Sequence, residues 1–200
     1  MADFNRIAPF YDVLKKVVFG NQIETASLHF LDEFRRKSNI LIVGGGSGEL
    51  LKNMDSNHQI LFLELSDGMI HKAQKVQTKA NVKFVVADLL TWKTSMKFDL
   101  VLTPFFLDCF NEGQLNMIVP KLKGFLKKDG YWVHTDFYPK NPLQNLLVSS
   151  MYLFFRLTSQ LKTSRLENFS AIFRKHKLIC LRKACFYHSM IESRVYQKIE

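Results

Sequence analysis

Three glycines at alternate positions, Gly44, Gly46 and Gly48, follow a short apolar run at residues 40–43. The run predicts a strand that is buried on both faces, and a helical pattern begins at Ser47. Glycine lets a ligand come close to the backbone, and a helix N-terminus offers free N–H groups to a phosphate or a carboxylate. The residues at this corner are therefore suited to bind a nucleotide.

Two acidic residues stand where the next two apolar runs end. Glu64 closes the second run about 20 residues beyond Gly44, the distance at which a ribose-binding carboxylate is expected. Asp88 follows the third run. A dinucleotide fingerprint would require glycine at position 49, where the chain has Glu49, so that pattern is excluded. The glycines and both acids fall in register at the strand ends of one predicted sheet, and together they indicate a nucleotide site.

Five segments of the chain resemble the motifs of the class I S-adenosylmethionine (SAM) methyltransferases. Residues 44–48 match the first motif of that family, residues 64–70 the second and residues 87–89 the third. Residues 98–104 and 126–133 match its fourth and fifth strands. The resemblance covers most of the chain and implies SAM as the cofactor.

The N-terminal residues resemble one subgroup of this family, and one position departs from the family pattern. Residues 5–12 look like the start of the quinone-biosynthesis methyltransferases and their small-molecule relatives. The family usually carries an acid two residues before the first glycine, where this chain has Ile42. In the family that acid helps to hold the methionine end of SAM, so the amino group needs another partner here or binding is weaker.

The predicted fold is a doubly wound, mostly parallel sheet of seven strands in a single domain over residues 1–200. Strand and helix patterns alternate five times between residues 39 and 137, which implies parallel strands with helices on both faces. Helices are predicted over about 47–54, 67–79 and 111–128, and another over 165–176. Residues 177–188 and 190–199 alternate as two strands with a short connection, which predicts a C-terminal antiparallel hairpin. The resembled family has this Rossmann-like architecture and ends in the same way.

Two segments fall outside the alternation. Residues 1–37 predict an N-terminal helical cap, and residues 138–163 contain an inserted apolar helix centred on 143–157. That helix is too short and too interrupted to span a bilayer. It could be a core helix, a lid over an apolar acceptor, or a weak contact with a membrane surface.

The resemblance implies a role for each residue at the strand ends. The glycine loop faces the methionine part of SAM, and Glu64 accepts hydrogen bonds from both ribose hydroxyls. Leu65 and Met69 flank the adenine, and Asp88 accepts from its amino group with the Leu89 N–H nearby; a capping role is the alternative for Asp88. The complete predicted cofactor set is Gly44, Gly46, Gly48, Glu64, Leu65, Met69, Asp88, Leu89 and Thr103.

Catalytic candidates lie near the position expected for the methyl group. An oxygen acceptor needs a base, and His134 and Asp136 at the end of the fifth strand are candidates, with Tyr11 of the cap beside them. A structural role is the alternative for His134, and packing on the sheet is the alternative for Tyr11. We expect Tyr11, Thr103, His134 and part of the 143–157 helix to line one acceptor cavity.

The overall composition leaves three classes of function open. The formal charge is +10, and the three cysteines lack the spacing of a metal site, so no metal is expected. Reduced cysteines and the absence of a signal peptide predict a cytoplasmic protein. The favoured interpretation is a SAM-dependent methyltransferase for a small apolar or aromatic acceptor. One alternative is an RNA or DNA methyltransferase, supported by the charge and by the stretch at residues 103–106. The other is a non-catalytic SAM-fold binding protein, supported by Ile42. The sequence leaves the oligomeric state open.

Overall fold

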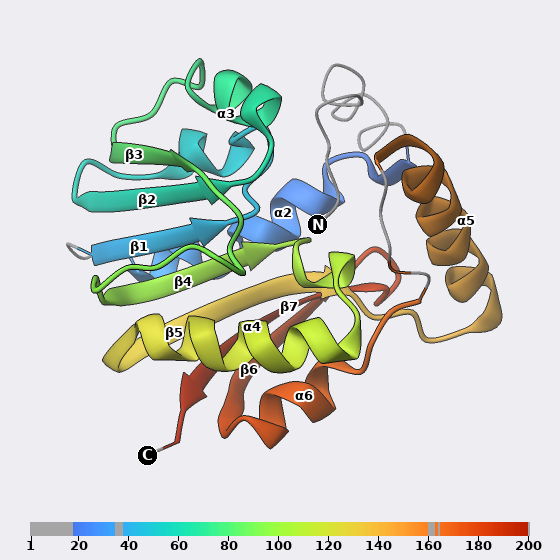
Figure 1. The fold of residues 1–200 in the computed structure, drawn as a ribbon. Helices are drawn as coiled ribbons and strands as arrows, with labels where there is room; N and C mark the ends of the chain where they lie inside the picture. Colours follow the sequence, from blue (N-terminus) through green and yellow to red (C-terminus); the bar gives the residue numbers. More distant parts are fainter. Residues whose placement is uncertain (1–17, 35–37, 160–162, 164, 200) are drawn as a thin grey trace.

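The computed structural model describes residues 18–34, 38–159, 163 and 165–199. One sheet of seven strands runs through it in the order β3-β2-β1-β4-β5-β7-β6 (Figure 1). The five strands β1 to β5 are parallel, and β7 pairs antiparallel with both β5 and β6, which confirms the predicted fold. The strands are β1 Ser38–Val43, β2 His58–Glu64, β3 Asn81–Val86, β4 Phe98–Pro104, β5 Leu126–Phe137, β6 Leu178–Phe186 and β7 Ile191–Lys198.

The central strand β1 explains why the first apolar run is continuous. Leu41 and Val43 point into one hydrophobic core, while Ile40 and Ile42 point into the core on the other face of the sheet. A strand covered on both faces must be apolar at successive positions. The Ile42 side chain, where the resembled family has an acid, is fully buried.

Helices form a layer on each face of the sheet. The helices α4 Glu112–Phe125 and α6 Phe169–Lys175 supply side chains to the core that contains Leu41 and Trp132. The opposite core, around Ile42, is closed by α2 Gln22–Leu28, η1 Leu31–Phe34, η2 Glu49–Asn53 and α3 Asp67–Ala73. The short turn η3 Leu107–Cys109 connects β4 to α4.

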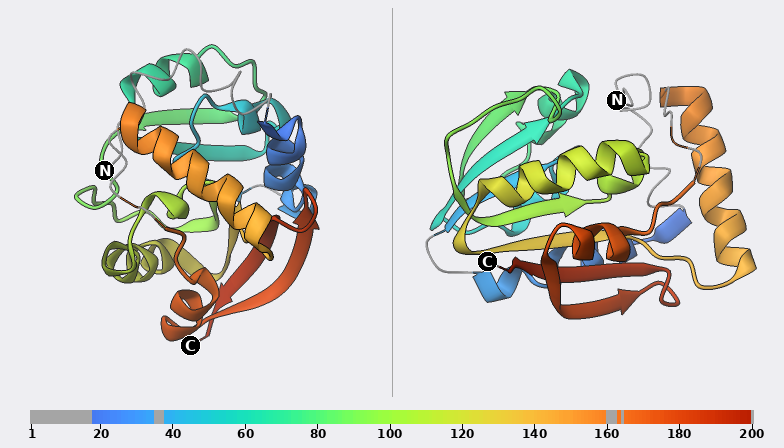
Figure 2. Two further views of the ribbon diagram at one scale, coloured as in Figure 1. Left: turned by 90° about the vertical axis from the view of Figure 1, so that its right-hand side faces the viewer. Right: turned by 60° about the horizontal axis from the view of Figure 1, so that its bottom comes forward.

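The helix α5 Pro142–Ser159 belongs to neither layer, and it corresponds to the predicted apolar helix. It crosses the edge of the sheet where the parallel strands end (Figure 2). Its inner residues Val148 and Tyr152 join a third apolar cluster with Phe137 and Met190. The helix therefore lies on the side of the sheet where ligands bind in doubly wound folds.

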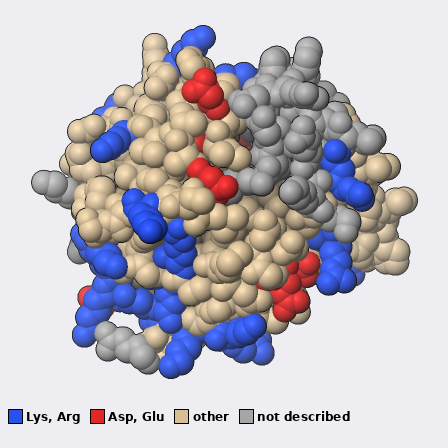
Figure 3. Space-filling model, viewed as in Figure 1, with Lys and Arg blue, Asp and Glu red and all other residues tan. Residues whose placement is uncertain are grey.

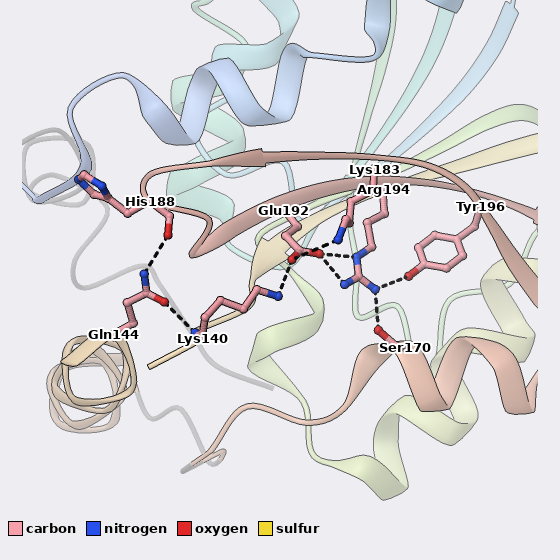
Figure 4. A network of polar contacts seen from close by, with 8 residues as sticks. All are labelled: Lys140, Gln144, Ser170, Lys183, His188, Glu192, Arg194 and Tyr196. Carbon is pink, nitrogen blue, oxygen red and sulfur yellow. Dashed lines mark hydrogen bonds and ion pairs between the residues drawn. The ribbon is translucent and has the colours of Figure 1, made fainter. Parts of the chain in front are cut away.

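A network of polar contacts attaches this helix to the C-terminal hairpin (Figure 4). The fully buried Glu192 of β7 lies 2.6 Å from the Lys140 ammonium just before α5, and it accepts a hydrogen bond from Arg194. Arg194 also donates to Ser170 of α6. Gln144 in the first turn of α5 donates to a carbonyl in the β6–β7 turn. These contacts fix the start of α5 relative to the sheet.

Some predicted helices are shorter than the sequence pattern indicates. The helix expected over 47–54 is instead the 3-10 helix η2, which begins only after Gly48, because the φ of 81° at this glycine is not helical. The helix expected over 67–79 ends at Ala73, after which the chain turns back toward β3. The helix expected over 165–176 begins after Asn168, whose side chain caps its first turn. Of the predicted 1–37 cap, residues 1–17, including Tyr11, and residues 35–37 lie outside the described residues.

Candidate functional site

The glycine loop after β1 combines tight packing with open space. A Cβ added at Gly44 would lie 2.2 Å from Cδ2 of Phe106, so glycine is needed there for the phenylalanine ring to pack on the loop. Gly46 also has a positive φ, 58°, but a Cβ added there would meet nothing within 4 Å. The Phe106 ring therefore packs against the loop at Gly44, while the space beside Gly46 is open to a ligand.

The Glu64 carboxylate is held in place by three backbone N–H groups. It accepts hydrogen bonds from Gly46 at 3.2 Å, from Leu65 at 2.8 Å and from Ser66 at 3.0 Å. Burial raises the pKa of Glu64, and these three hydrogen bonds oppose that rise. The side chain thus connects the end of β2 to the glycine loop and presents a fixed acceptor at the end of the sheet.

A hollow lies beside Glu64, with about 630 Å³ of empty space that is partly open to solvent. We call it the Glu64 hollow. Six of the nine predicted cofactor residues line it: Gly44, Gly46, Glu64, Leu65, Met69 and Leu89. The structure thus brings together residues from three separate motifs at one place.

The other three predicted cofactor residues do not line the Glu64 hollow. Gly48 packs against α3. The Asp88 carboxylate accepts a hydrogen bond from the Leu90 N–H at 2.8 Å, which is the capping alternative weighed above. Thr103 is fully buried and accepts a hydrogen bond from the Trp132 indole at 2.8 Å. The geometry gives these residues roles in shaping the loops and the core.

His134 is enclosed in the core and does not line the hollow either. Its ring is fully buried, stacks on Phe173 with centroids 5.3 Å apart and meets the edge of Phe169. Burial, helped by the charge of Arg194, lowers the pKa of His134 to about 3, so the ring is neutral at physiological pH. Side chains alternate along β5, and the position of His134 faces α6. The expected cavity shared by Thr103 and His134 is therefore not formed, and its place is taken by core packing.

Asp136, also fully buried, supports the turn after β4. Its carboxylate accepts hydrogen bonds from the N–H groups of Asp108 and Phe137, at 3.2 and 2.9 Å. Burial raises the pKa of Asp136 well above its usual value, and the neighbouring Asp108 raises it further. Burial also raises the pKa of Asp108, to about 6. The Tyr152 hydroxyl of α5 donates to the Asp108 carbonyl at 3.1 Å, so η3 is held between β5 and α5.

Several residues of the hollow were not among the predicted site residues. Phe105, Phe106, Cys109 and Phe110 line its other side, from the end of β4 and from η3. Their signal in the sequence is the aromatic pair directly after the fourth strand. This side of the hollow is apolar, in contrast with the backbone groups and carboxylate of the glycine-loop side.

The residues that are present fit SAM. The open space beside Gly46 and the fixed Glu64 acceptor suit a ribose with two hydroxyl donors. Leu65, Met69 and Leu89 provide an apolar surface for a flat base. None of the described residues that line the hollow is basic, which agrees with a ligand that carries a sulfonium cation and no phosphate.

Two further kinds of feature are absent from the described ranges. No helix there is long and apolar enough to cross a membrane. No group of three or more His, Cys, Asp or Glu side chains there could hold a metal ion.

Solved structures share the fold across nearly the whole chain. A complex of DhpI with S-adenosylhomocysteine (SAH) matches with a TM-score of 0.75 and 14% identity, covering 98% of this chain and 93% of that one. The 1,6-didemethyltoxoflavin-N1-methyltransferase of Burkholderia thailandensis matches with a TM-score of 0.69 and 13% identity, covering 97% and 85%. At these identities the likeness shows the fold, and both structures hold SAH.

Sequence comparisons also match the chain to methyltransferases. A malonyl-[acyl-carrier protein] O-methyltransferase of Acetivibrio thermocellus is 30% identical over 138 residues, which are 67% of this chain and 47% of that relative. The match thus spans about half the length of the relative. Residues 40–130 match the family model described as a methyltransferase domain. By its motifs, its sheet order and these matches, the chain belongs to the class I SAM-dependent methyltransferases.

Proposed function

We propose that this protein transfers a methyl group from SAM to a small apolar or aromatic acceptor. The observation that carries the proposal is the Glu64 hollow, where six predicted cofactor residues surround one fixed carboxylate. Two of the similar proteins carry an acceptor in their names: the sequence relative names a malonyl-[acyl-carrier protein], and one structural match names 1,6-didemethyltoxoflavin. These acceptors differ widely, so the class of acceptor is argued from the site itself.

The residues of the hollow would work mainly by positioning the reactants. SAM supplies a methyl group already activated by its sulfonium. Glu64 would orient the ribose, and the glycine loop would let the ligand approach the backbone closely. Holding two reactants in line can supply a large part of the rate of a displacement reaction.

The apolar side of the hollow is the proposed acceptor side. Phe105 and Cys109 line the hollow and also pack against the third apolar cluster, to which α5 contributes. The Phe105 ring lies 4.9 Å from that of Phe137, which places the hollow beside α5. Side chains of this kind would hold an apolar or aromatic acceptor and exclude water.

Asp108 is the proposed proton acceptor for an oxygen nucleophile. It lies next to Cys109, which lines the hollow, and burial raises its pKa to about 6, toward the physiological range. A general base works best when its pKa is near the working pH. Asp136 would act through Asp108 by holding η3 in place.

Three finer points belong to the same proposal. The three cysteines are free thiols, which supports a reducing compartment such as the cytoplasm. The outer face of α5 supports a weak contact with an anionic membrane surface, because Leu143, Leu146 and Leu153 are exposed on it. The segment around this helix would not repel such a surface, since no acidic residue occurs between Asp136 and Glu167.

The charge of +10 would also give weak, non-specific nucleic-acid binding.

The test is calorimetric binding of SAM and SAH to the purified protein, followed by mass identification of any co-purified acceptor. Folded protein that binds neither ligand would contradict the proposal. Binding without turnover on any acceptor would favour the non-catalytic alternative. A tight RNA complex at physiological salt, with one sequence preferred, would favour a nucleic-acid substrate instead.

A further inference from the structure

A second hollow opens on the other side of the glycine loop. It has about 460 Å³ of empty space, and it is lined by the loop, by Pro104 and Phe105, and by α2 with Glu24 and Ser27. We call it the Glu24 hollow. Gly44, Gly46 and Phe105 line both hollows, so the two spaces meet at the loop. A ligand whose ribose is bound at Glu64 can extend past Gly46 into the second space.

The Glu24 hollow carries negative charge on a strongly basic protein. Its titratable lining side chains among the described residues are Glu24 and Glu49, and none of them is basic. The chain as a whole has a charge of +10. On the face drawn in Figure 3, acidic residues lie in the upper middle and at the lower right, whereas Lys and Arg are spread over the top, the left side, the bottom and the right. The hollow is therefore complementary to a cation.

One of these two carboxylates is free for a ligand. Glu49 already has a partner. Glu24 is half-buried in the first turn of α2, and no hydrogen bond or ion pair joins it to another residue of the described ranges. A half-buried carboxylate gains from a charge-assisted hydrogen bond. The fully buried Ile42, at the end of β1, offers no charge to a ligand in this region.

We infer that Glu24 accepts hydrogen bonds from the α-ammonium group of the methionine part of SAM. The inference depends on the proposed SAM binding and adds a residue from outside the motifs. The ribose at Glu64 and the ammonium at Glu24 would hold the two ends of the donor on either side of the glycine loop. The sulfonium between them would then lie near Phe105, which lines both spaces.

The test compares ligands with and without the amino-acid part. Glu24→Gln should weaken SAM and SAH binding roughly 10- to 100-fold, the range for loss of a hydrogen bond between charged groups. The same variant should bind 5′-methylthioadenosine as the wild type does, since this ligand has the ribose and base but no ammonium group. Glu64→Ala should weaken the binding of all three ligands.

Glu112→Gln is the matched control, because it removes the same charge from the first turn of α4. It should leave all three affinities unchanged. If Glu24→Gln binds SAM as tightly as the wild type, or loses 5′-methylthioadenosine equally, the ammonium assignment is overturned while SAM binding stands. If the wild type binds none of the three ligands, the proposed function fails first, so the two failures are distinguishable.

Discussion

The two halves of the ligand-binding edge are built in different ways. On the β1–β2 half, a glycine loop and three backbone N–H groups hold one carboxylate beside an open hollow. On the β4–β5 half, Asp136, His134 and Thr103 are fully buried. The Thr103 hydroxyl bonds to the His134 ring and accepts from the Trp132 indole, and the Asp136 carboxylate accepts from the backbone N–H of Asp108. The first half is arranged to contact a ligand, and the second to position an apolar wall.

This difference separates two kinds of change. A substitution at Gly46 or Glu64 on the β1–β2 half should alter donor binding more than folding, because both residues line the Glu64 hollow. A substitution on the β4–β5 half should alter stability or its pH dependence and leave donor binding nearly intact. Each of the following predictions tests one side of this separation.

The largest expected effect is the loss of stability in His134→Ala. The variant leaves a cavity beside Phe169 and Phe173, and it should lower the free energy of unfolding by about 2–4 kcal/mol. The affinity for SAM should stay within about twofold of the wild type. Urea denaturation and calorimetry measure the two quantities. A stable variant that has lost only turnover would return His134 to a catalytic role.

The same residue predicts a pH dependence. The pKa of about 3 in the folded protein lies below the ordinary value near 6.5, so the unfolded chain binds more protons between these values. The wild type should therefore lose stability as the pH falls from about 6.5 toward 3. His134→Ala should lack this component, as denaturation at several pH values would show.

Glu64→Ala should have the largest effect on donor binding. It removes the acceptor that three N–H groups orient, and SAM affinity should fall at least about tenfold, a loss above about 1.4 kcal/mol. Unfolding measurements serve as the control, because a collapsed loop would weaken binding for another reason. Unchanged affinity in a folded variant would remove Glu64 from the site.

The effect of Gly46→Ala on SAM binding is expected to be smaller than that of Glu64→Ala, and Gly20→Ala is its matched control. Gly46 and Gly20 have nearly the same positive φ, 58° and 57°, and a Cβ meets nothing within 4 Å at either position. Both alanine variants should lose about 1 kcal/mol of stability from backbone strain. Only Gly46→Ala should also weaken SAM binding, by about tenfold, because its methyl group enters the hollow. Equal affinity in the two variants would place the ligand elsewhere.

The two halves also differ in how far the sequence predicts them. The β1–β2 half can be predicted from local patterns, because Gly44, Gly46 and Glu64 lie at the ends of strands that the sequence itself indicates. Their positions do not depend on how distant segments pack. On the β4–β5 half, the face of the sheet to which the His134 side chain points depends on the register of β5. The helix α6, which covers that face, lies more than 30 residues later in the sequence. Glu24 could not be predicted either, because its approach to the loop depends on how α2 packs.

Asp108→Asn tests the proposed base with an effect of opposite sign to that of His134. The pKa of about 6 lies above the ordinary value near 3.8, so the folded protein binds more protons between these values and its stability falls as the pH rises through them. The variant should be more stable than the wild type above pH 6, by on the order of 1 kcal/mol. With an oxygen acceptor, its turnover should fall and lose the rise near pH 6, while SAM affinity is unchanged.

The smallest effect is expected on the outer face of α5. Leu143, Leu146 and Leu153 are 76%, 67% and 58% exposed, so replacing all three by serine should change the free energy of unfolding by less than about 0.5 kcal/mol each. If this face contacts an anionic membrane, the wild type should co-sediment with phosphatidylglycerol vesicles better than with phosphatidylcholine vesicles, and less so at high salt. The triple variant should lose that binding while keeping SAM affinity.

The control is a double variant with serine at Val86 and Met117, which are exposed elsewhere, and it should bind vesicles as the wild type does. Equal binding by both variants would mean that net charge alone attracts the protein, and the helix would then serve only as the wall of the acceptor side.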